Sequence, residues 1–148
     1  MLNPHSLLIV DDDELLAGML SDLLRAADYD VWIARNGLDG YSIYHQNQVE
    51  TVLADIEMPE LDGFEMMRRI RAINSSVRTI YMSGAPAQHR RTLLTEVQSF
   101  GADVLRKPFD PIDLLRLISS PVEEKVIRGE PGYKWSAQGK KPVWKQAG

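Results

Sequence analysis

Five short, mainly apolar segments alternate along the chain with longer segments in which apolar residues recur every three or four positions. Short apolar segments bounded by turn-forming residues are typical of buried strands in a parallel sheet. We predict strands over residues 6–10, 30–34, 51–55, 78–82 and 103–106. The helical spacing predicts helices over residues 15–27, 38–46, 64–70, 87–100 and 112–118.

This alternation of strands and helices predicts an α/β domain with a doubly wound parallel sheet and right-handed crossovers. Asp13 or Asp12 is placed to cap the first helix, and Gly101 to end the fourth. The pattern by itself leaves the strand order open. Both common doubly wound orders bring the carboxyl ends of strands one and three near a switch point, where ligands bind.

Length and composition indicate one ordinary globular domain with a small appendage. The chain has 148 residues, of which 44% are hydrophobic and 26% charged. No apolar run approaches the roughly 20 residues that span a bilayer, and the start of the chain lacks the basic region of a signal peptide. The absence of cysteine excludes disulfides and thiolate metal sites. We therefore expect a cytoplasmic protein that does not interact with membranes.

Charge divides the chain into an acidic body and a basic end. The net charge is −4, but residues 121–148 carry +3, which leaves −7 on residues 1–120. Such an asymmetry suggests two parts with different partners. We expect one domain over residues 5–120, a linker or helix extension over 121–128, and a basic tail with two tryptophans over 129–148.

Chemically useful side chains stand at the ends of four predicted strands. Three aspartates follow the first strand and Asp55 ends the third, while Ser83 and Lys107 follow the fourth and fifth. Clustered carboxylates repel one another unless a cation neutralises them, and oxygen ligands at an open site favour Mg²⁺. A carboxylate beside Mg²⁺ is a suitable nucleophile toward phosphorus, and a lysine and a hydroxyl stabilise phosphoryl oxygens. Each residue alone has a plainer explanation as a helix cap, a turn or a surface lysine, but together they predict phosphoryl transfer.

Four motifs contain these residues: LIVDDD at residues 8–13, DIEMPELDG at 55–63, YMSG at 81–84 and LRKPF at 105–109. In this order and at these separations they resemble the receiver domain of two-component response regulators, over about residues 5–120. The resemblance implies a five-stranded sheet of order 2-1-3-4-5. It also implies a role for each site residue. Asp55 would be the phosphoacceptor. The ligands of Mg²⁺ would be Asp11, Asp12, Asp55 and the backbone carbonyl of Glu57. Ser83 and Lys107 would bind the phosphoryl group.

The resemblance further implies a signalling protein rather than an enzyme, whose only chemistry is its own phosphorylation and dephosphorylation. A sensor histidine kinase or a phosphotransfer protein would be the phosphoryl donor. The resulting change at the fourth helix, fifth strand and fifth helix would alter partner binding or produce a homodimer. A stand-alone receiver that acts as a phosphorelay shuttle or protein-binding adaptor is the alternative.

Two features set this chain apart from related patterns. Family members often carry an aromatic residue three positions before the lysine, whereas this chain has Val104, so an aromatic rotamer switch is excluded there. Phosphatases and phosphomutases of the haloacid dehalogenase type also form an aspartyl phosphate. They usually need a second aspartate two residues after the nucleophile, where this chain has Glu57.

The tail has a resemblance of its own. Residues 135–144, WSAQGKKPVW, resemble the C-terminal DNA-binding motif of the histone-like nucleoid-structuring (H-NS) family, whose loop enters the minor groove of A/T-rich DNA. Glycine permits close approach of the backbone, and flanking polar and cationic residues sense the groove's width and potential. The implied DNA-binding residues are Gln138, Gly139, Lys140 and Lys141. The alternative is a basic tail that docks on the receiver or on another protein.

Overall fold

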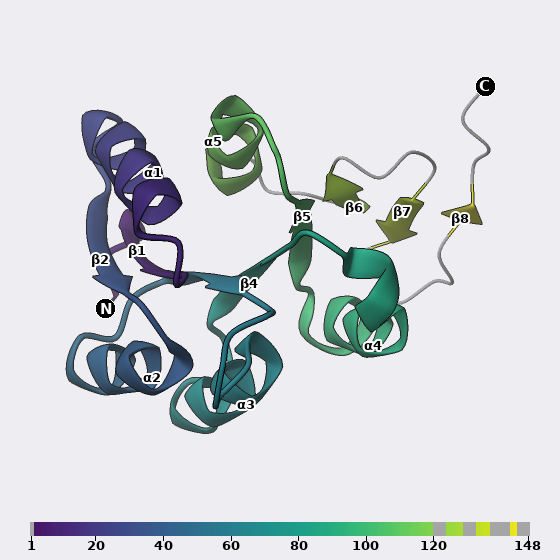
Figure 1. Ribbon diagram of the computed structural model, residues 1–148, viewed down its shortest axis with the longest axis horizontal. Helices are drawn as coiled ribbons and strands as arrows, with labels where there is room; N and C mark the ends of the chain where they lie inside the picture. The colour runs from purple at the N-terminus through teal and green to yellow at the C-terminus, as the bar shows by residue number, and fades with distance from the viewer. Residues whose placement is uncertain (1, 120–123, 129–132, 137–142, 145–148) are drawn as a thin grey trace. The chain divides into compact units, whose positions relative to one another are not determined.

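The computed structural model describes residues 2–119, 124–128, 133–136 and 143–144 (Figure 1). Its first five strands are β1 (Ser6–Val10), β2 (Asp30–Ala34), β3 (Thr51–Asp55), β4 (Arg78–Ser83) and β5 (Asp103–Arg106). Its helices are α1 (Glu14–Ala26), α2 (Gly37–Gln46), α3 (Gly63–Ile73), a 3-10 turn η1 (Pro86–His89), α4 (Arg90–Phe100) and α5 (Pro111–Ser119). Strands and helices thus alternate as the sequence predicts.

The strand order of the first five strands is β2-β1-β3-β4-β5. β1 pairs in parallel with β2 through Leu8↔Trp32 and with β3 through Leu8↔Val52. The doubly wound receiver-like fold and the order 2-1-3-4-5 are therefore confirmed. Because the sheet is parallel, both faces of its inner strands are covered by crossover helices, and every residue of β1 and β3 is buried.

The chain divides into two compact units, Met1–Ile80 and Tyr81–Gly148, with the boundary inside β4. In the first unit, α1 covers one face of the strands, and α2 and α3 cover the other (Figure 1). The apolar interior of this unit includes Leu20 and Leu24 from α1 and Met66 and Ile70 from α3, all fully buried. The two residues on each helix lie four positions apart, as the helical pattern predicts.

Side-chain caps begin the three helices of the first unit. Asp13 accepts a hydrogen bond from the backbone N–H of Leu16, and Asn36 and Asp62 make the corresponding bonds at α2 and α3. Such caps satisfy backbone donors that the helix leaves unpaired. Of the two aspartates that the sequence offers as a cap for α1, Asp13 has this role. Within the described ranges, none of the helices has the length and apolar character needed to cross a bilayer.

The fourth helix begins differently. The sequence predicts one helix over residues 87–100, but the structure has η1 followed by α4, and no side-chain hydrogen bond caps the start of either segment. Pro86 stands at the first turn and lacks a backbone N–H. Gly101 ends α4 in the left-handed conformation, with φ at 68°, which confirms the predicted stop.

The described part of the C-terminal region adds three strands to the order, β6 (Glu124–Arg128), β7 (Tyr133–Ser136) and β8 (Val143–Trp144). β6 pairs in parallel with β5, and β7 pairs antiparallel with both β6 and β8. β6 thus occupies positions that the sequence analysis assigned to a linker or helix extension. The candidate DNA-binding residues Gln138, Gly139, Lys140 and Lys141 lie outside the described residues.

Candidate phosphoacceptor site

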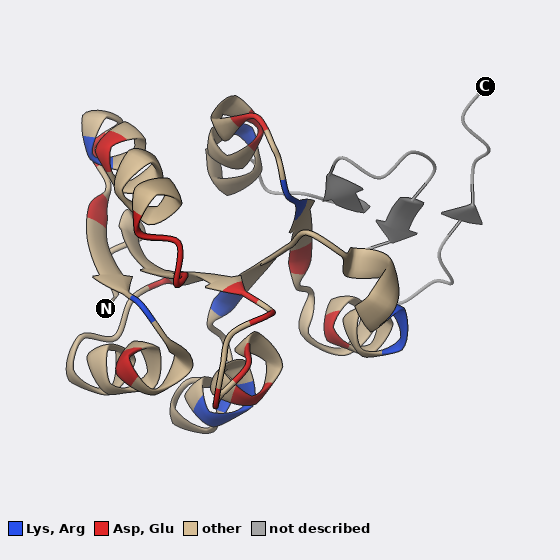
Figure 2. Cartoon of the chain, viewed as in Figure 1, with Lys and Arg blue, Asp and Glu red and all other residues tan. Residues whose placement is uncertain are grey.

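Three aspartates come together in the first unit. Asp11 and Asp12 follow β1, and Asp55 ends β3; one carboxylate oxygen from each lies within 4.8 Å of the others. Figure 2 shows the acidic residues gathered in the segment between β1 and α1. β1 and β3 are adjacent and parallel, so their carboxyl ends meet at one edge. The sequence prediction that these acids cluster is therefore confirmed.

The three carboxylates differ in exposure and support. Asp11 is fully buried and Asp55 is 4% exposed, whereas Asp12 is exposed to solvent. The carboxylate of Asp11 accepts a hydrogen bond of 2.9 Å from the backbone N–H of Asp13. This bond orients Asp11 toward the start of α1. The cluster therefore has two buried acids and one that water reaches.

The cluster fits a magnesium ion. Each bond from Mg²⁺ to oxygen is about 2.1 Å, so ligands on opposite sides of the ion are about 4.2 Å apart. Oxygens within 4.8 Å of one another suit an ion that some carboxylates bind directly and others through water. Mg²⁺ keeps several waters at such sites, and the exposed Asp12 carboxylate leaves room for them.

A tight loop connects Asp55 to α3. A Cβ atom on Gly63 would lie 2.3 Å from the carbonyl oxygen of Asp55, closer than side-chain carbons approach such atoms. The N–H of Gly63 donates a 3.1 Å hydrogen bond to the carbonyl of Ile56. Glu60 has a positive φ of 68°, a conformation that residues with a Cβ rarely adopt. Glu57 lies in the same loop, with its side chain exposed.

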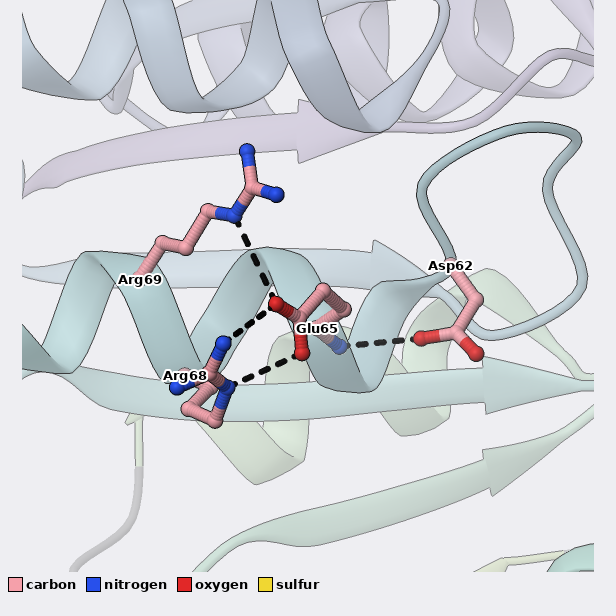
Figure 3. A network of polar contacts seen from close by, with 4 residues as sticks. All are labelled: Asp62, Glu65, Arg68 and Arg69. Atoms are coloured by element: carbon pink, nitrogen blue, oxygen red, sulfur yellow. Dashed lines mark hydrogen bonds and ion pairs between the residues drawn. The ribbon is translucent and has the colours of Figure 1, made fainter.

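Asp62, at the end of this loop, takes part in a network of polar contacts on the surface of α3 (Figure 3). Asp62 caps α3 by accepting from the N–H of Glu65 at 2.9 Å. Glu65 accepts from Arg68 at 2.9 and 2.5 Å, and pairs with Arg69 at 3.5 Å. The hydrogen bond from Arg68 and the adjacent positive charges hold the pKa of Glu65 below its usual value. The start of α3 is thus stabilised by a hydrogen bond to its backbone and by ion pairs between side chains on its surface.

The two predicted phosphoryl-binding residues are joined to each other in the second unit. The N–H of Lys107 donates a 2.8 Å hydrogen bond to the carbonyl of Ser83. Ser83 is fully buried, and its hydroxyl oxygen accepts a 3.0 Å hydrogen bond from the N–H of Ala85. Lys107 is half-buried. The ends of β4 and β5 are therefore held in register through the residues that the sequence singles out.

The second unit also contains a buried polar pair that the sequence analysis missed. The hydroxyl of Tyr81 donates a hydrogen bond to a carboxylate oxygen of Glu96. Tyr81 is fully buried and Glu96 is 5% exposed. The sequence did contain one indication of this pair: Glu96 stands between Leu93 and Val97 in the apolar stripe of α4. An acid on a buried helical face needs a hydrogen-bonding partner.

Comparison with known protein families matches residues 7–119 to the response regulator receiver domain. The chain belongs to this family. It is 32% identical over 117 residues to "Sporulation initiation phosphotransferase F" of Bacillus subtilis (strain 168), which covers 78% of this chain and 90% of that protein. It is 25% identical to "Probable transcriptional regulator ycf29" of Pyropia yezoensis, over 84% of this chain but 56% of that protein. This chain thus spans only about half the length of that relative.

Among solved structures, the chain is similar to a response regulator receiver domain protein (CheY-like) from Methanospirillum hungatei JF-1. The TM-score is 0.69 and the sequence identity 26%, over 80% of this chain and 91% of that one. Receiver domains are signalling proteins that bind Mg²⁺ at an acidic cluster and exchange phosphoryl groups with histidine kinases or phosphotransfer proteins. Their own activity is limited to phosphorylation and dephosphorylation.

Proposed function

We propose that this chain is a response regulator whose phosphoacceptor is Asp55, with a sensor histidine kinase or a phosphotransfer protein as donor and the cytoplasm as its location. The observation that carries the proposal is the cluster of Asp11, Asp12 and Asp55, whose carboxylates gather within 4.8 Å at the ends of β1 and β3. A receiver domain without this cluster would lack both its acceptor and its ion.

The proposed reaction transfers a phosphoryl group from nitrogen to oxygen. A carboxylate oxygen of Asp55 attacks phosphorus, the P–N bond to the donor histidine breaks, and the nitrogen leaves with the bonding electrons. Asp11, Asp12 and the backbone carbonyl of Glu57 would hold Mg²⁺ beside Asp55. When bound, the ion neutralises charge on the phosphoryl oxygens.

Two further groups complete the proposed site. The hydroxyl of Ser83 would donate a hydrogen bond to a phosphoryl oxygen, and the ammonium group of Lys107 would pair with another. The hydrogen bond from the Ala85 N–H to the Ser83 hydroxyl oxygen supports this role, because it positions that oxygen at the end of β4. The backbone bond between Lys107 and Ser83 would keep the two groups together.

Phosphorylation with a small-molecule donor tests the acceptor. The protein is incubated with acetyl phosphate and Mg²⁺, and intact mass is measured. We expect one acid-stable, base-labile phosphoryl adduct that Asp55→Asn and chelation of Mg²⁺ both abolish. Asp22→Asn, which changes an exposed carboxylate on α1, is the matched control and should form the adduct as the wild type does. An unchanged adduct in Asp55→Asn would refute the assignment.

We propose as an output that the C-terminal tail binds A/T-rich DNA in the minor groove through Gln138, Gly139, Lys140 and Lys141. Two observations favour it. Residues 121–148 carry a charge of +3. In sequence, the four candidate residues stand between β7 and β8, which pair through Tyr133↔Trp144.

Variants matched in charge test this output. Replacing Lys140 and Lys141 by alanine should weaken binding to an A/T-rich duplex more than replacing Lys125 and Lys134, which lie in β6 and β7. Each double variant loses two cations, so the general attraction of the protein to DNA phosphates falls equally in both. Equal losses would argue against a specific loop. No binding at low salt would favour the shuttle or adaptor alternative.

We propose that phosphorylation also promotes a homodimer. A single short basic segment makes few contacts with DNA phosphates and therefore binds DNA weakly. Two tails in one dimer would raise the apparent affinity through effective concentration. Sedimentation velocity with and without acetyl phosphate measures this directly. A monomer in both conditions would remove the dimer from the proposal without affecting the assignment of Asp55.

A further inference from the structure

The start of α2 lies directly against the loop that follows Asp55. A Cβ atom on Gly37, the first residue of α2, would lie 2.5 Å from the carbonyl oxygen of Leu61 and 3.0 Å from its Cβ atom. This oxygen belongs to the backbone, so it cannot swing aside as the end of a long side chain can. Gly37 is buried and Leu61 is only 6% exposed. Only a residue without a Cβ atom therefore fits at the start of α2 while the loop keeps this path.

The loop is tightly folded where α2 meets it. The N–H of Leu61 donates a 2.8 Å hydrogen bond to the carbonyl of Pro59. The carbonyl of Ile56 accepts two further hydrogen bonds of 3.1 Å each, from the N–H groups of Met58 and Gly63. These bonds connect both ends of the loop, so a displacement at Leu61 is transmitted to the residues that follow Asp55.

The segment that leads into α2 also contacts the acidic cluster. The carbonyl of Ala34, at the end of β2, accepts a 3.1 Å hydrogen bond from the N–H of Asp11. Three residues later, Gly37 meets the loop. Residues 34–37 thus connect the backbone of one proposed Mg²⁺ ligand to the loop that carries another, the carbonyl of Glu57.

Hydrogen bonds hold the start of α2 itself. The side chain of Asn36 accepts a 2.8 Å bond from the N–H of Asp39 and donates a 3.0 Å bond to the Asp39 carboxylate. The carbonyl of Asn36 accepts a 2.9 Å bond from the N–H of Gly40. These bonds close the first turn of the helix, so the backbone at Gly37 gives Leu61 a firm support.

We propose that Gly37 is a positioning residue for the magnesium site: it allows the start of α2 to support the loop of residues 56–63, so that the carbonyl of Glu57 reaches the ion held by the aspartate cluster. This inference rests on the proposed function. A methyl group at position 37 would displace the loop and leave the three carboxylates in place. Because Mg²⁺ requires nearly ideal octahedral geometry, a small displacement of the carbonyl ligand should weaken binding of the ion.

Titration with Mg²⁺ in the absence of a phosphoryl donor tests this role. In isothermal titration calorimetry of the full-length protein, Gly37→Ala should raise the dissociation constant of Mg²⁺ about tenfold, a usual cost of disturbing a group that orients a metal ligand. Gly40→Ala is the matched control. A Cβ atom there would lie 2.7 Å from the Sδ atom of Met66 and 2.9 Å from a methyl group of Val10. It overpacks the same helix against side chains instead of the loop, and the dissociation constant should stay that of the wild type.

Hydrogen exchange of single amides, followed by NMR without Mg²⁺, reports the loop directly. The amides of Leu61 and Gly63 donate hydrogen bonds within the loop. We expect them to exchange about tenfold faster in Gly37→Ala than in Gly40→Ala, because amides exchange through local opening. A loss of stability common to both variants would accelerate exchange in both, so the difference between them reports the contact at Gly37.

Asn36→Ala is a second variant, for the case that Gly37→Ala does not fold. It removes the side-chain hydrogen bonds to Asp39 without adding an atom against the loop. It should raise the dissociation constant of Mg²⁺ roughly threefold, in proportion to the usual contribution of a helix cap.

The inference is overturned if folded Gly37→Ala binds Mg²⁺ as the wild type does, or if Gly40→Ala loses as much affinity. Where Gly37→Ala does not fold, unchanged affinity in Asn36→Ala overturns it. If the wild type itself binds no Mg²⁺, the proposed function fails and the inference fails with it. If the wild type binds the ion and forms the phosphoryl adduct, and Gly37→Ala does both equally well, only the inference fails.

Discussion

Helices α3 and α4 each follow a strand that ends in a site residue, yet they are attached in opposite ways. α3 begins at Gly63, directly against the carbonyl of Asp55, with Asp62 as its cap. α4 begins after an uncapped 3-10 turn, and its polar attachment to β4 lies farther along, at Glu96. One helix is fixed at its start and the other at its middle.

This difference in attachment suits two tasks of the domain, positioning the phosphoacceptor and responding to its phosphorylation. A phosphoacceptor needs a carboxylate in a constant position, because small displacements of a reacting group are costly. The loop around Asp55 provides this through contacts that leave no room for a methyl group at Gly63. A response to phosphorylation needs a segment that moves at little cost, and the start of α4 lacks the side-chain cap that fixes the start of α3. Variants that weaken α3 should therefore impair the acceptor, and variants at the start of α4 should not.

The largest effect is expected at Gly63. Gly63→Ala forces a Cβ atom against the carbonyl of Asp55, and we expect the free energy of unfolding to fall by about 3 kcal/mol, as for an overpacked core. Urea denaturation measures this. Gly18→Ala is the control, because a Cβ at that position in α1 meets nothing within 4 Å; it should raise stability by up to about 1 kcal/mol. Equal effects of the two variants would contradict the close approach.

A smaller effect is expected at the cap of α3. Asp62→Ala removes the hydrogen bond to the Glu65 N–H and should lower the free energy of unfolding by about 1 kcal/mol. The rate of adduct formation with acetyl phosphate should fall as well, since the cap ends the loop that carries Asp55. If stability falls and the rate does not, the start of α3 is not needed to position the acceptor.

The smallest effect is expected at the exposed pair of Arg68 and Glu65. Hydrogen bonding and charge from Arg68 lower the pKa of Glu65 from its usual value of 4.5, so the pair stabilises the fold only while Glu65 is ionised. The stability difference between wild type and Arg68→Ala should be fully present above about pH 4.5 and disappear as pH falls through the lowered pKa. Urea denaturation at several pH values and at low salt measures it. A difference that grows on acidification would contradict this sign.

Local patterns predicted most of the fold, because parallel strands are short apolar runs with marked ends. The bounds of β1, β2, β3 and β5 agree with the prediction, and the cluster of Asp11, Asp12 and Asp55 follows from strand ends that share one edge. The split of the fourth helix was missed, since the helical spacing continues through η1 and only the lack of a cap distinguishes it.

Contacts between distant residues were not predictable in the same way. The bond from Tyr81 to Glu96 depends on which residue of α4 lies over which residue of β4, and helix packing angles vary too much to derive this from spacing. The contact between Gly63 and Asp55 depends on the path of a nine-residue loop motif, in which Glu60 takes a positive φ. The strands β6, β7 and β8 lack the long apolar pattern that identified the others.

Chemical trapping of the phosphorylated residue tests the assignment of Asp55 most directly. The protein is treated with acetyl phosphate and Mg²⁺, then with borohydride, which reduces an acyl phosphate but not a free carboxylate, and the peptides are sequenced by mass spectrometry. We predict reduction at Asp55 alone, with none at Asp11 or Asp12. Reduction at either of those residues, or at none of the three, would contradict the proposed function.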